Sequence, residues 1–345
     1  MRKASGAMYG LAYGDALGKP TEFLNYEEIV HRFGPAGPCV LSGSPALVTD
    51  DTQMTLAVAH ALIDAMAESP ADRQAGSSQN SLTAATFGPH LRSRYLAWAQ
   101  SPENNRAPGM TCLRAIGRLS EGLPWAEATE AGSKGCGANM RVAPLGLVPG
   151  LTEPDRAAAA QFQAALTHGH PTALAASELT AFAVYWLADG LPPGQLLDAL
   201  RQRCHEQRET YHGDWLGELW QRPGAVSPEE FIARGWDECL AALDVVAAAL
   251  AVANPAVDAD PCLATGAGWI AEEALATALY CYLQRPDAPV PLLGRAAASS
   301  GDSDSIASIA GALAGAALGF EAWPAKWAEQ IEYRDQLDRF GRLWD

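Results

Sequence analysis

Three short segments of the sequence place carboxylate side chains beside glycine or hydroxyl-bearing residues. They are residues 14–22 (GDALGKPTE), 49–52 (TDDT) and 301–305 (GDSDS). Each segment alone could simply cap a helix, because Asp, Ser and Thr accept hydrogen bonds from the free N–H groups of a first turn. A helix needs only one cap, however, whereas Asp50-Asp51 and Asp302-x-Asp304 each supply paired carboxylates and a neighbouring hydroxyl. That pattern is typical of ligands for a hard divalent cation.

The donor atoms of these segments indicate the kind of metal and the number of ions. Oxygen ligands alone suit magnesium, manganese or calcium rather than zinc. If the acids converge, five negative charges would repel one another in a partly buried cleft; these acids are Glu22, Asp50, Asp51, Asp302 and Asp304. Two divalent ions would nearly neutralise them. We therefore expect a binuclear site no more than about 10 Å across.

A glycine-rich segment at residues 132–144 (GSKGCGANMRVAP) is suited to holding an anion. Its Gly-x-Gly core lets backbone amides approach a phosphate, and Lys134 and Arg141 are local positive charges. It is not a Walker loop or a dinucleotide-binding fingerprint, because the Gly-Lys-Ser/Thr ending of the first and the strand and third glycine of the second are absent. Two interpretations remain open for the segment alone, a phosphate cradle and an ordinary turn.

The net charge restricts the classes of partner. The 345 residues include 24 Lys and Arg against 40 Asp and Glu, which gives a net charge of −16. Such a surface repels nucleic acid and anionic lipid, and no basic run offsets it. We therefore expect no nucleic-acid binding. An anionic ligand would have to be held by backbone amides or metal ions.

Cysteine usage and hydropathy favour a cytoplasmic protein. The seven cysteines are scattered and form no C-x-x-C pair, which argues against a disulfide framework and a structural zinc site. The longest near-apolar run, around residues 241–253, is too short to span a bilayer, and Asp15 interrupts the first apolar stretch. We expect neither a signal peptide nor a membrane anchor.

The elements that position these segments are predicted to be helices. The chain is rich in Ala and Leu, and its apolar residues recur at helical spacing, which indicates an all-α fold. Helices are expected at about residues 5–17, 54–65, 90–100, 157–167, 173–188, 236–252, 269–283 and 325–339. A polar stretch at residues 69–81 is expected to form a surface loop.

Small residues recur at every fourth position near both ends of the chain. The two stripes are Gly6, Gly10, Gly14 and Gly18, and Ala307, Gly311, Gly315 and Gly319. Glycine costs about 1 kcal/mol in a helix interior, so a stripe of it indicates close approach of another backbone. We hypothesise that the two terminal helices meet in the core. This contact would close residues 1–345 into a single domain.

Six short motifs, taken in order along the chain, resemble those of the ADP-ribosylglycohydrolase family. They are GDALGKPTE, TDDTQM, GCGANMRVAPLGL, THGHP, GWIAEEALATAL and GDSDSIASIAGALAGA, between about residues 6 and 320. The resemblance implies a compact orthogonal bundle of helices that uses two Mg²⁺ or Mn²⁺ ions to hydrolyse the glycosidic bond between ADP-ribose and an acceptor side chain. ADP-ribosyl-arginine on a protein is the expected substrate, and ADP-ribose the product ligand.

The resemblance also implies roles for individual residues. The metal ligands would be Thr49, Asp50, Asp51, Asp302, Asp304 and Ser305. Proton transfer would fall to Glu22, Asp302 or Asp304, with Glu22 matching a flexible acidic position near the scissile bond. The ligand-binding positions would be Gly135, Cys136, Gly137, Ala138, Asn139, Met140, His168 and Trp269. For Trp269, core packing is the alternative to stacking on the ligand, and His170 is expected to be structural.

Two departures from the family pattern affect these expectations differently. Ser303 and Ser305 replace the Thr of many relatives and keep the hydroxyl. Residues 102–111 (PENNRAPGMT) replace a segment in which relatives of the dinitrogenase-reductase-activating type carry an Asp near the acceptor, so a different acceptor is an alternative. The alternatives from other functional classes are a non-catalytic ADP-ribose-binding or immunity protein and a metal hydrolase that cleaves the pyrophosphate to release AMP.

Overall fold

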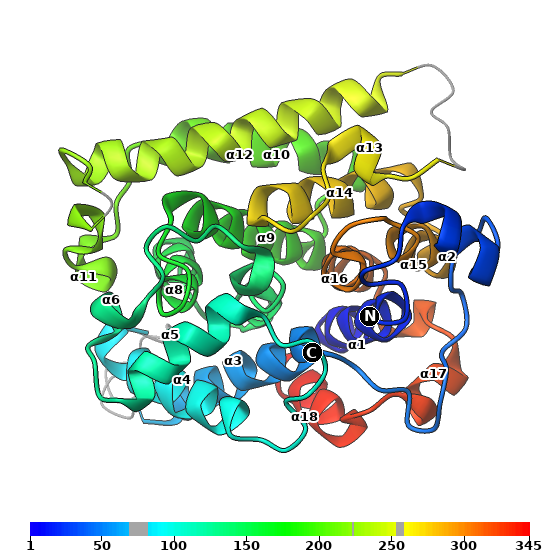
Figure 1. Ribbon diagram of the computed structural model, residues 1–345, viewed down its shortest axis with the longest axis horizontal. Coiled ribbons are helices and arrows are strands. Elements are labelled where there is room, and N and C mark those ends of the chain that lie inside the picture. Colours follow the sequence, from blue (N-terminus) through cyan, green and yellow to red (C-terminus); the bar gives the residue numbers. More distant parts are fainter. Residues whose placement is uncertain (69–81, 223, 253–258) are drawn as a thin grey trace.

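The computed structural model describes residues 1–68, 82–222, 224–252 and 259–345, and these ranges are mainly helical (Figure 1). The α-helices and 3-10 helices (η) are α1 Lys3–Gly18, α2 Tyr26–Phe33, α3 Asp50–Ala67, α4 Ala84–Ala99, α5 Met110–Ser120, α6 Trp125–Ala128, η2 Cys136–Ala138, α7 Ala143–Leu147, α8 Glu153–Ala165, α9 Pro171–Asp189, α10 Pro193–Gln207, α11 Gly213–Leu216, η3 Leu219–Gln221, α12 Pro228–Leu250, α13 Cys262–Thr265, α14 Ala271–Gln284, α15 Pro289–Ala297, α16 Ser303–Leu318, η4 Phe320–Ala322, α17 Ala325–Gln330 and α18 Arg334–Trp344. Extended pairing within the described ranges is limited to three isolated bridges. The all-α prediction is confirmed, whereas the loop expected at residues 69–81 lies outside the described residues.

Local sequence signals explain where the longer helices begin. The Thr49 side chain accepts a hydrogen bond from the first turn of α3, and Ser227 does the same for α12. His170 caps α9 in this way, since its side chain accepts from Thr172 N, and Pro171 follows at the first helical position. Proline is tolerated there because its missing N–H would have no partner in the helix. Cap residues and prolines therefore set these boundaries.

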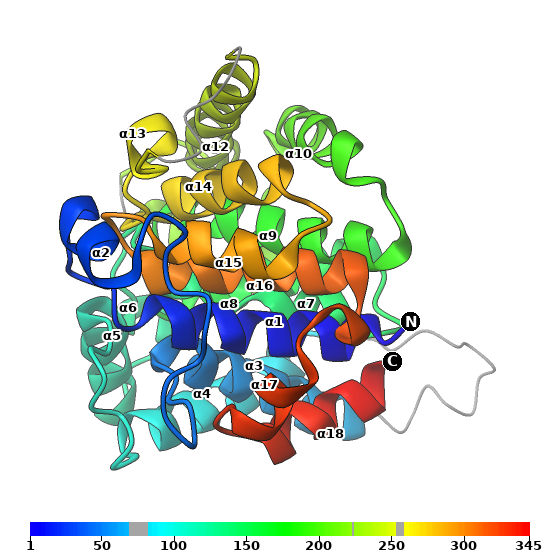
Figure 2. The ribbon, with the colours of Figure 1, turned by 90° about the vertical axis from the view of Figure 1, so that its right-hand side faces the viewer.

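The glycine stripes bring the first and last motifs together. Helices α1 and α16 lie side by side near the centre of the fold (Figure 2). A Cβ atom added to Gly10 would lie 2.2 Å from the backbone oxygen of Gly311, and one added to Gly14 would lie 2.0 Å from that of Ala307. No side chain fits at such a distance. The hypothesis that the terminal helices meet in the core is confirmed.

The remaining helices surround this central pair in crossing layers. Helices α9, α14 and α15 pack against α16, while α18 packs against α1. Helix α12 crosses the pair at a steep angle. Figure 1 shows α12 lengthwise and the pair nearly end-on, and Figure 2 shows the reverse. Buried apolar residues form a cluster that extends from Ala4 to Phe340. Among the described helices, none has the length and apolar character needed to cross a bilayer.

The segment expected to be one helix at residues 325–339 is two helices, so this prediction is wrong. The chain breaks between α17 and α18 because residues 330–332 run beside Ala46, with Ala46 N donating to Gln330 O and Glu332 N donating to Ala46 O. Tyr333 then adopts a left-handed backbone conformation with φ of 57°.

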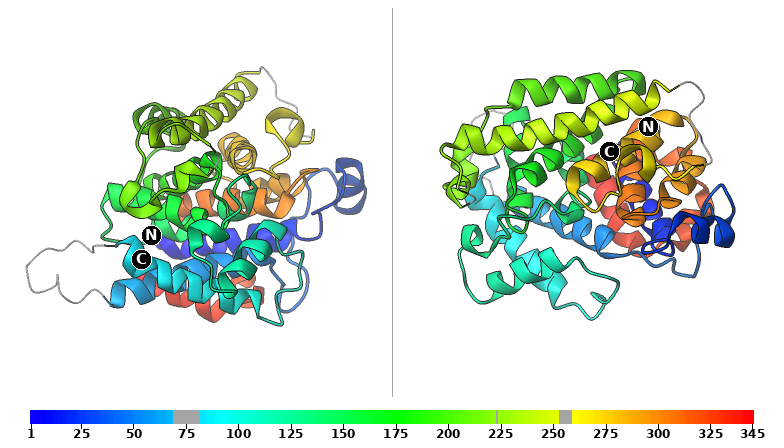
Figure 3. Two further views of the ribbon diagram at one scale, coloured as in Figure 1. Left: turned by 60° about the vertical axis from the view of Figure 1, so that its left-hand side comes forward. Right: turned by 45° about the horizontal axis from the view of Figure 1, so that its top comes forward.

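The two ends of the chain lie close together (Figure 3), and Ser5 N donates to the Asp345 carboxylate at 3.1 Å.

Candidate active site

A cleft of about 470 Å³ contains most of the predicted site residues. This volume is within the usual range for a small-molecule site. The predicted residues that line it are Glu22, Asp50, Asp51, Gly135, Cys136, Gly137, Met140, His168, Trp269, Asp302, Asp304 and Ser305. Segments from both ends and the middle of the chain therefore meet around one space.

The floor of the cleft is formed where two helices begin. Asp50 and Asp51 occupy the first turn of α3, and Asp302 and Asp304 lie at the start of α16. Ser305 connects the two groups, since its hydroxyl lies 3.4 Å from an Asp51 carboxylate oxygen. Two helix N-termini, each carrying partial positive charge, thus point at the acidic cluster and partly offset its repulsion.

The fifth acid, Glu22, lies in the turn that follows α1 and differs in its exposure. The four aspartates are buried, with exposed fractions of 2 to 8%. Glu22 is only partly buried and lies beside Asp304. It is therefore the acid of this cluster that can move without disrupting a helix.

Asp15 supports the acidic floor and was missed by sequence reasoning, although it lies within the first acidic motif. It is fully buried in α1, and its carboxylate accepts hydrogen bonds from Thr49 N at 2.9 Å and Thr52 N at 3.0 Å. The Thr52 hydroxyl donates to the same carboxylate at 2.5 Å. Asp15 therefore caps α3 from outside that helix and fixes the backbone of the Asp50-Asp51 pair.

Burial and mutual repulsion raise the carboxyl pKa values throughout the floor. Burial raises the pKa of Asp50 to about 7, with Asp304 contributing, and burial together with the Asp304 carboxylate raises that of Asp15 to about 7. The pKa of Glu22 rises to about 10 because of burial and then the charges of Asp304 and Asp302. Burial also raises the pKa of Asp51, Asp302 and Asp304. Among the described residues, the two helix N-termini thus leave much of the repulsion within the cluster uncompensated.

The donor set fits divalent cations by its chemistry. One carboxylate oxygen of Asp51, Oδ2, is buried without a hydrogen-bond partner, although an orphaned buried acceptor is costly. Carboxylate and hydroxyl oxygens are the ligands that Mg²⁺ and Mn²⁺ prefer. Within the described ranges, no three His, Cys, Asp or Glu side chains already surround one point as ligands, so carboxylate rotamers would adjust on binding.

The glycine loop forms a wall beside the acids, since Cys136 Sγ donates to Asp302 Oδ2 at 2.8 Å, and it is joined to two other segments. Cys136 N donates to Trp269 O at 3.1 Å, and Ala271 N donates to Lys134 O at 2.8 Å. At its start, Glu130 pairs with Thr167 and Gly169 through backbone hydrogen bonds. The loop is therefore held on both sides.

His168 explains why glycines occupy this loop. A Cβ atom at Gly137 would lie 3.2 Å from the His168 ring and 3.1 Å from Cys112 Sγ. Burial, followed by the nearby Arg141, lowers the pKa of His168 well below its ordinary value, so the imidazole is neutral. Its Nδ1 lies 2.8 Å from the Thr167 hydroxyl. The other ring nitrogen, Nε2, is left beside the glycines on the cleft side.

Several predicted residues lie elsewhere than expected. Ala138 and Asn139 are fully buried behind the cleft wall, and Asn139 Nδ2 donates to Ala271 O. Thr49 does not line the cleft, but its hydroxyl hydrogen-bonds to Asp304 and Asp51 N. These three contribute to the site by supporting its walls.

The two cations assigned to the phosphate cradle do not face it as free charges. Lys134 forms ion pairs with Glu238 and Glu272. Arg141 is fully buried, and its guanidinium donates to Gln163 and Thr167 beneath the loop. The two cations differ in compensation: Lys134 is paired with two carboxylates, whereas the partners of Arg141 are neutral and its charge still acts on His168 at the cleft. The amides of Gly135 and Gly137 remain as candidate donors, because that of Cys136 is bonded to Trp269 O.

Two exposed aromatic rings border the mouth of the cleft. Phe23 and Trp269 are 68% and 44% exposed, and their rings stack with centroids 5.8 Å apart. Both line the cleft. Trp269 is therefore at the predicted position beside the ligand space rather than in the core, while Phe23 was not anticipated.

Comparisons with known proteins agree with this geometry. The family profile described as ADP-ribosylglycohydrolase matches residues 1–345. The chain belongs to the ADP-ribosylglycohydrolase family.

Relatives within the ADP-ribosylglycohydrolase family include named hydrolases. The chain is 30% identical to the ADP-ribosyl-[dinitrogen reductase] glycohydrolase of Rhodospirillum rubrum over 63% of this chain and 68% of that protein. It is 24% identical to the ADP-ribosylarginine hydrolase Tri1 of Pseudomonas putida over 99% of this chain and 77% of that protein. A solved structure described as an ADP-ribosylglycohydrolase-related protein complex has a TM-score of 0.63 and 23% identity, covering 99% of this chain and 98% of that chain. This last likeness concerns the fold.

The ADP-ribosylglycohydrolase cleft also includes residues that the motifs did not identify. Residues 107–112 form one of its walls, with Met110 62% exposed at the mouth. Gly109 N donates to Asp50 Oδ2 at 3.1 Å, which connects this wall directly to the acidic floor. In the sequence, residues 102–111 stood out only because they depart from the family pattern. That departure did not indicate which residues they contact.

Proposed function

We propose that this protein hydrolyses the N-glycosidic bond between ADP-ribose and an arginine side chain of a modified protein, and that it requires two Mg²⁺ or Mn²⁺ ions. The observation that carries the proposal is the meeting of buried aspartates at the starts of α3 and α16 with a glycine loop in one cleft. The relatives named as acting on ADP-ribosylarginine support arginine as the acceptor.

The two walls of the cleft suit the two ends of ADP-ribose. We assign the pyrophosphate to the amides of Gly135 and Gly137, because the Cys136 amide is already bonded to Trp269 O and holds the turn in place. Neutral His168 contributes hydrogen bonding without adding charge. The exposed face of Trp269 is available for stacking on adenine or ribose. The scissile ribose then lies over the acids.

The acidic floor would hold the cations through the Asp50-Asp51 and Asp302-x-Asp304 pairs, with Ser305 between them. When bound, divalent ions supply Lewis acidity that orients the ribose hydroxyls and activates water. Glu22 lies at the edge of the cluster, so we assign to it the proton transfer to the departing guanidine. Water adds to the anomeric carbon as its bond to the guanidine nitrogen breaks, the guanidine takes the proton of Glu22, and the proton lost by the water restores Glu22, so that ADP-ribose and unmodified arginine leave.

Product identity tests the proposal. We expect chromatography to show ADP-ribose released from ADP-ribosyl-arginine in the presence of Mg²⁺ or Mn²⁺, and almost none in a chelator. ADP-ribosyl-serine serves as the comparison substrate. AMP as the product would favour pyrophosphate cleavage, and ADP-ribose binding without release from any acceptor would favour a binding protein.

Filling the glycine loop should weaken ligand binding without unfolding the protein. In Gly137→Val, the new side chain would collide with His168 and Cys112, since Cβ alone already lies 3.2 and 3.1 Å from them. We expect ADP-ribose affinity, measured by calorimetry, to fall at least about tenfold, the loss of roughly 1.4 kcal/mol. Helical circular dichroism and cation binding should persist. Unchanged affinity for ADP-ribose would exclude the loop as the pyrophosphate site.

Stability in the absence of cations should decrease as pH rises. A carboxyl whose pKa is raised by folding stabilises the protein below its ordinary pKa, about 4, and this contribution disappears as pH passes the raised value. For Asp15 and Asp50 that value is about 7. We therefore expect a lower melting temperature at pH 8 than at pH 5.5, and a larger rise on adding Mn²⁺ at pH 8.

The variant Asp51→Asn tests whether the pH dependence of the melting temperature comes from the buried acidic cluster or from the net charge of the protein. It removes one buried carboxylate, so its melting temperature in chelator should depend less on pH than that of the wild type. Asp198→Asn removes an exposed carboxylate on α10 and should leave the dependence unchanged. A cation-free melting temperature that is constant or rising from pH 5.5 to 8 would contradict the repulsion argument.

A further inference from the structure

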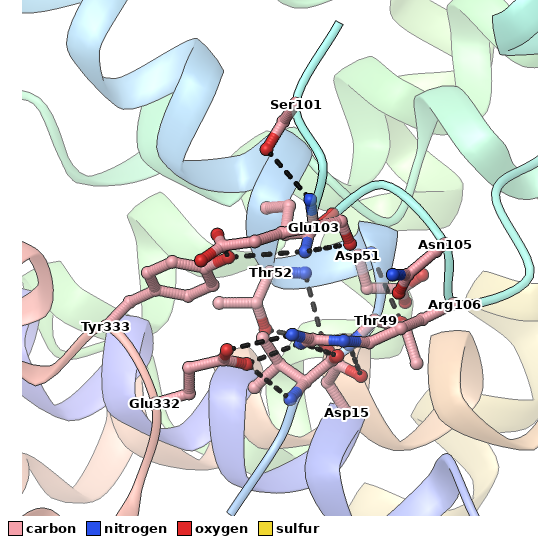
Figure 4. Close-up of polar contacts among 12 residues, drawn as sticks. Asp15, Thr49, Asp51, Thr52, Ser101, Glu103, Asn105, Arg106, Glu332 and Tyr333 are labelled. Carbon is pink, nitrogen blue, oxygen red and sulfur yellow. Dashed lines mark hydrogen bonds and ion pairs between the residues drawn. The ribbon is translucent and has the colours of Figure 1, made fainter. Parts of the chain in front are cut away.

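A loop, whose last residues also line the cleft, and the segment that joins the last two helices hold the α3 motif together. We call residues 101–109 and 330–333 together the clasp. Figure 4 shows its side chains converging beside Thr49 and Thr52, with Arg106 coming from the loop and Glu332 and Tyr333 from the other segment. Glu332 and Tyr333 lie beyond the last family motif in the sequence, so no motif draws attention to them.

The centre of the clasp is a bidentate ion pair between Arg106 and Glu332 that also hydrogen-bonds to the backbone of Val48. Arg106 Nη2 donates to Glu332 Oε1 at 2.9 Å, and Nη1 donates to the other carboxylate oxygen. The same Nη1 donates to Val48 O at 2.7 Å, while Val48 N donates to Glu332 Oε2 at 3.1 Å. Both polar groups of Val48 are thus fixed by charged partners, one residue before Thr49.

Two further contacts of the clasp reach α3 itself. Gly109 N donates to Asp50 Oδ2, as described above. Gln53, one turn further along α3, donates through Nε2 to Glu103 O at 3.2 Å and to the Tyr333 hydroxyl at 3.3 Å. Tyr333 also hydrogen-bonds to the Glu103 carboxylate. One loop therefore contacts positions 48, 50 and 53 in succession.

The clasp is held in a costly backbone conformation. Ala107 and Tyr333 have φ of 52° and 57°, values that residues with a side chain rarely adopt. The Arg106 and Glu332 side chains are only 15% and 12% exposed, so solvent screens their attraction weakly. Bidentate, shielded pairing of this kind fixes orientation, which suits holding a ligand motif rather than adding general stability.

We propose that Arg106 and Glu332 are positioning residues that hold the Asp50-Asp51 pair in the arrangement required for cation binding. The inference rests on the proposed function, because it assumes that these acids are ligands. Outer contacts that orient metal ligands are typically worth about 10- to 100-fold in metal affinity. Loss of the clasp should therefore affect the cation site from a distance.

The test measures Mn²⁺ binding directly in the purified chain. We expect Arg106→Gln and Glu332→Gln each to weaken Mn²⁺ binding about tenfold by calorimetry and to alter the electron paramagnetic resonance spectrum of the bound ion. The Mn²⁺ affinity of the double variant should be no lower than that of the weaker-binding single variant, because either substitution alone breaks the Arg106–Glu332 pair. Arg106→Lys keeps the charge but not the planar fork, so its affinity should fall between wild type and Arg106→Gln.

Arg94→Gln is the matched control. It breaks a different ion pair of an arginine, with Asp64 at the far end of α3, and should leave Mn²⁺ affinity and spectrum unchanged. Normal Mn²⁺ binding in folded Arg106 and Glu332 variants would overturn the positioning role of the clasp but not the metal centre. If the glutamine variants do not fold, normal Mn²⁺ binding by Arg106→Lys would have the same meaning. Absence of Mn²⁺ binding by the wild-type chain would overturn the proposed metal centre and the clasp's role together.

Discussion

Replacing Asp304 with alanine should reduce ADP-ribose release from ADP-ribosyl-arginine by more than about 100-fold, beyond the usual effect of an outer-shell contact. Asp304 is 3% exposed at the start of α16, and its charge raises the pKa of Asp15, Asp50 and Glu22. Its removal would loosen a cation and leave the other carboxylates poorly arranged around it. ADP-ribose binding should fall far less, because the glycine loop is a separate segment.

The decisive measurement is a comparison of release and binding for wild type and Asp304→Ala, each in Mg²⁺, in Mn²⁺ and in a chelator. Asp198→Ala, which removes an exposed acid from α10, is the control and should behave as wild type. Equally fast release by wild type with and without chelator would show the metal mechanism to be wrong. Wild type that binds ADP-ribose but releases none from any acceptor would favour a binding protein.

The substitution Gly311→Ala should destabilise the fold by at least about 3 kcal/mol, the upper part of the usual range for overpacking. The added Cβ atom would lie 2.0 Å from the backbone oxygen of Gly10, so α1 and α16 would have to separate. These two helices carry Asp15, Asp302 and Asp304, and the loss of stability should therefore be accompanied by weaker Mn²⁺ binding. Denaturant unfolding followed by circular dichroism measures the change.

Gly117→Ala is the control for the glycine substitution. Gly117 lies within α5, and no atom lies within 4 Å of an added Cβ. This change should stabilise the protein by roughly 0.5 to 1 kcal/mol, because alanine loses less conformational freedom in a helix. If Gly311→Ala unfolded at the same denaturant concentration as wild type, the close packing of α1 against α16 would not be essential.

Much of the site could be predicted because its chemistry is expressed locally. The Asp50-Asp51 and Asp302-x-Asp304 pairs indicate a cation by residue type alone, and the glycine stripes indicate that two backbones touch. That contact brings Asp304 close to Gly18, which joins the first and last motifs. The pairing of Lys134 could not be predicted, since its partners Glu238 and Glu272 come from distant helices.

The sequence by itself determined the helical fold, the clustering of oxygen-bearing side chains in short segments and the glycine-rich loop, because these depend on residue type and on spacing within a few turns. The tertiary structure alone decided that Asp15 caps α3, that Asn139 faces away from the cleft, and that Glu332 grips the backbone at Val48. The physical reason is that a side chain's hydrogen-bond partners are chosen by the packing of segments far apart in the chain. Spacing along the chain carries no record of which distant segments become neighbours.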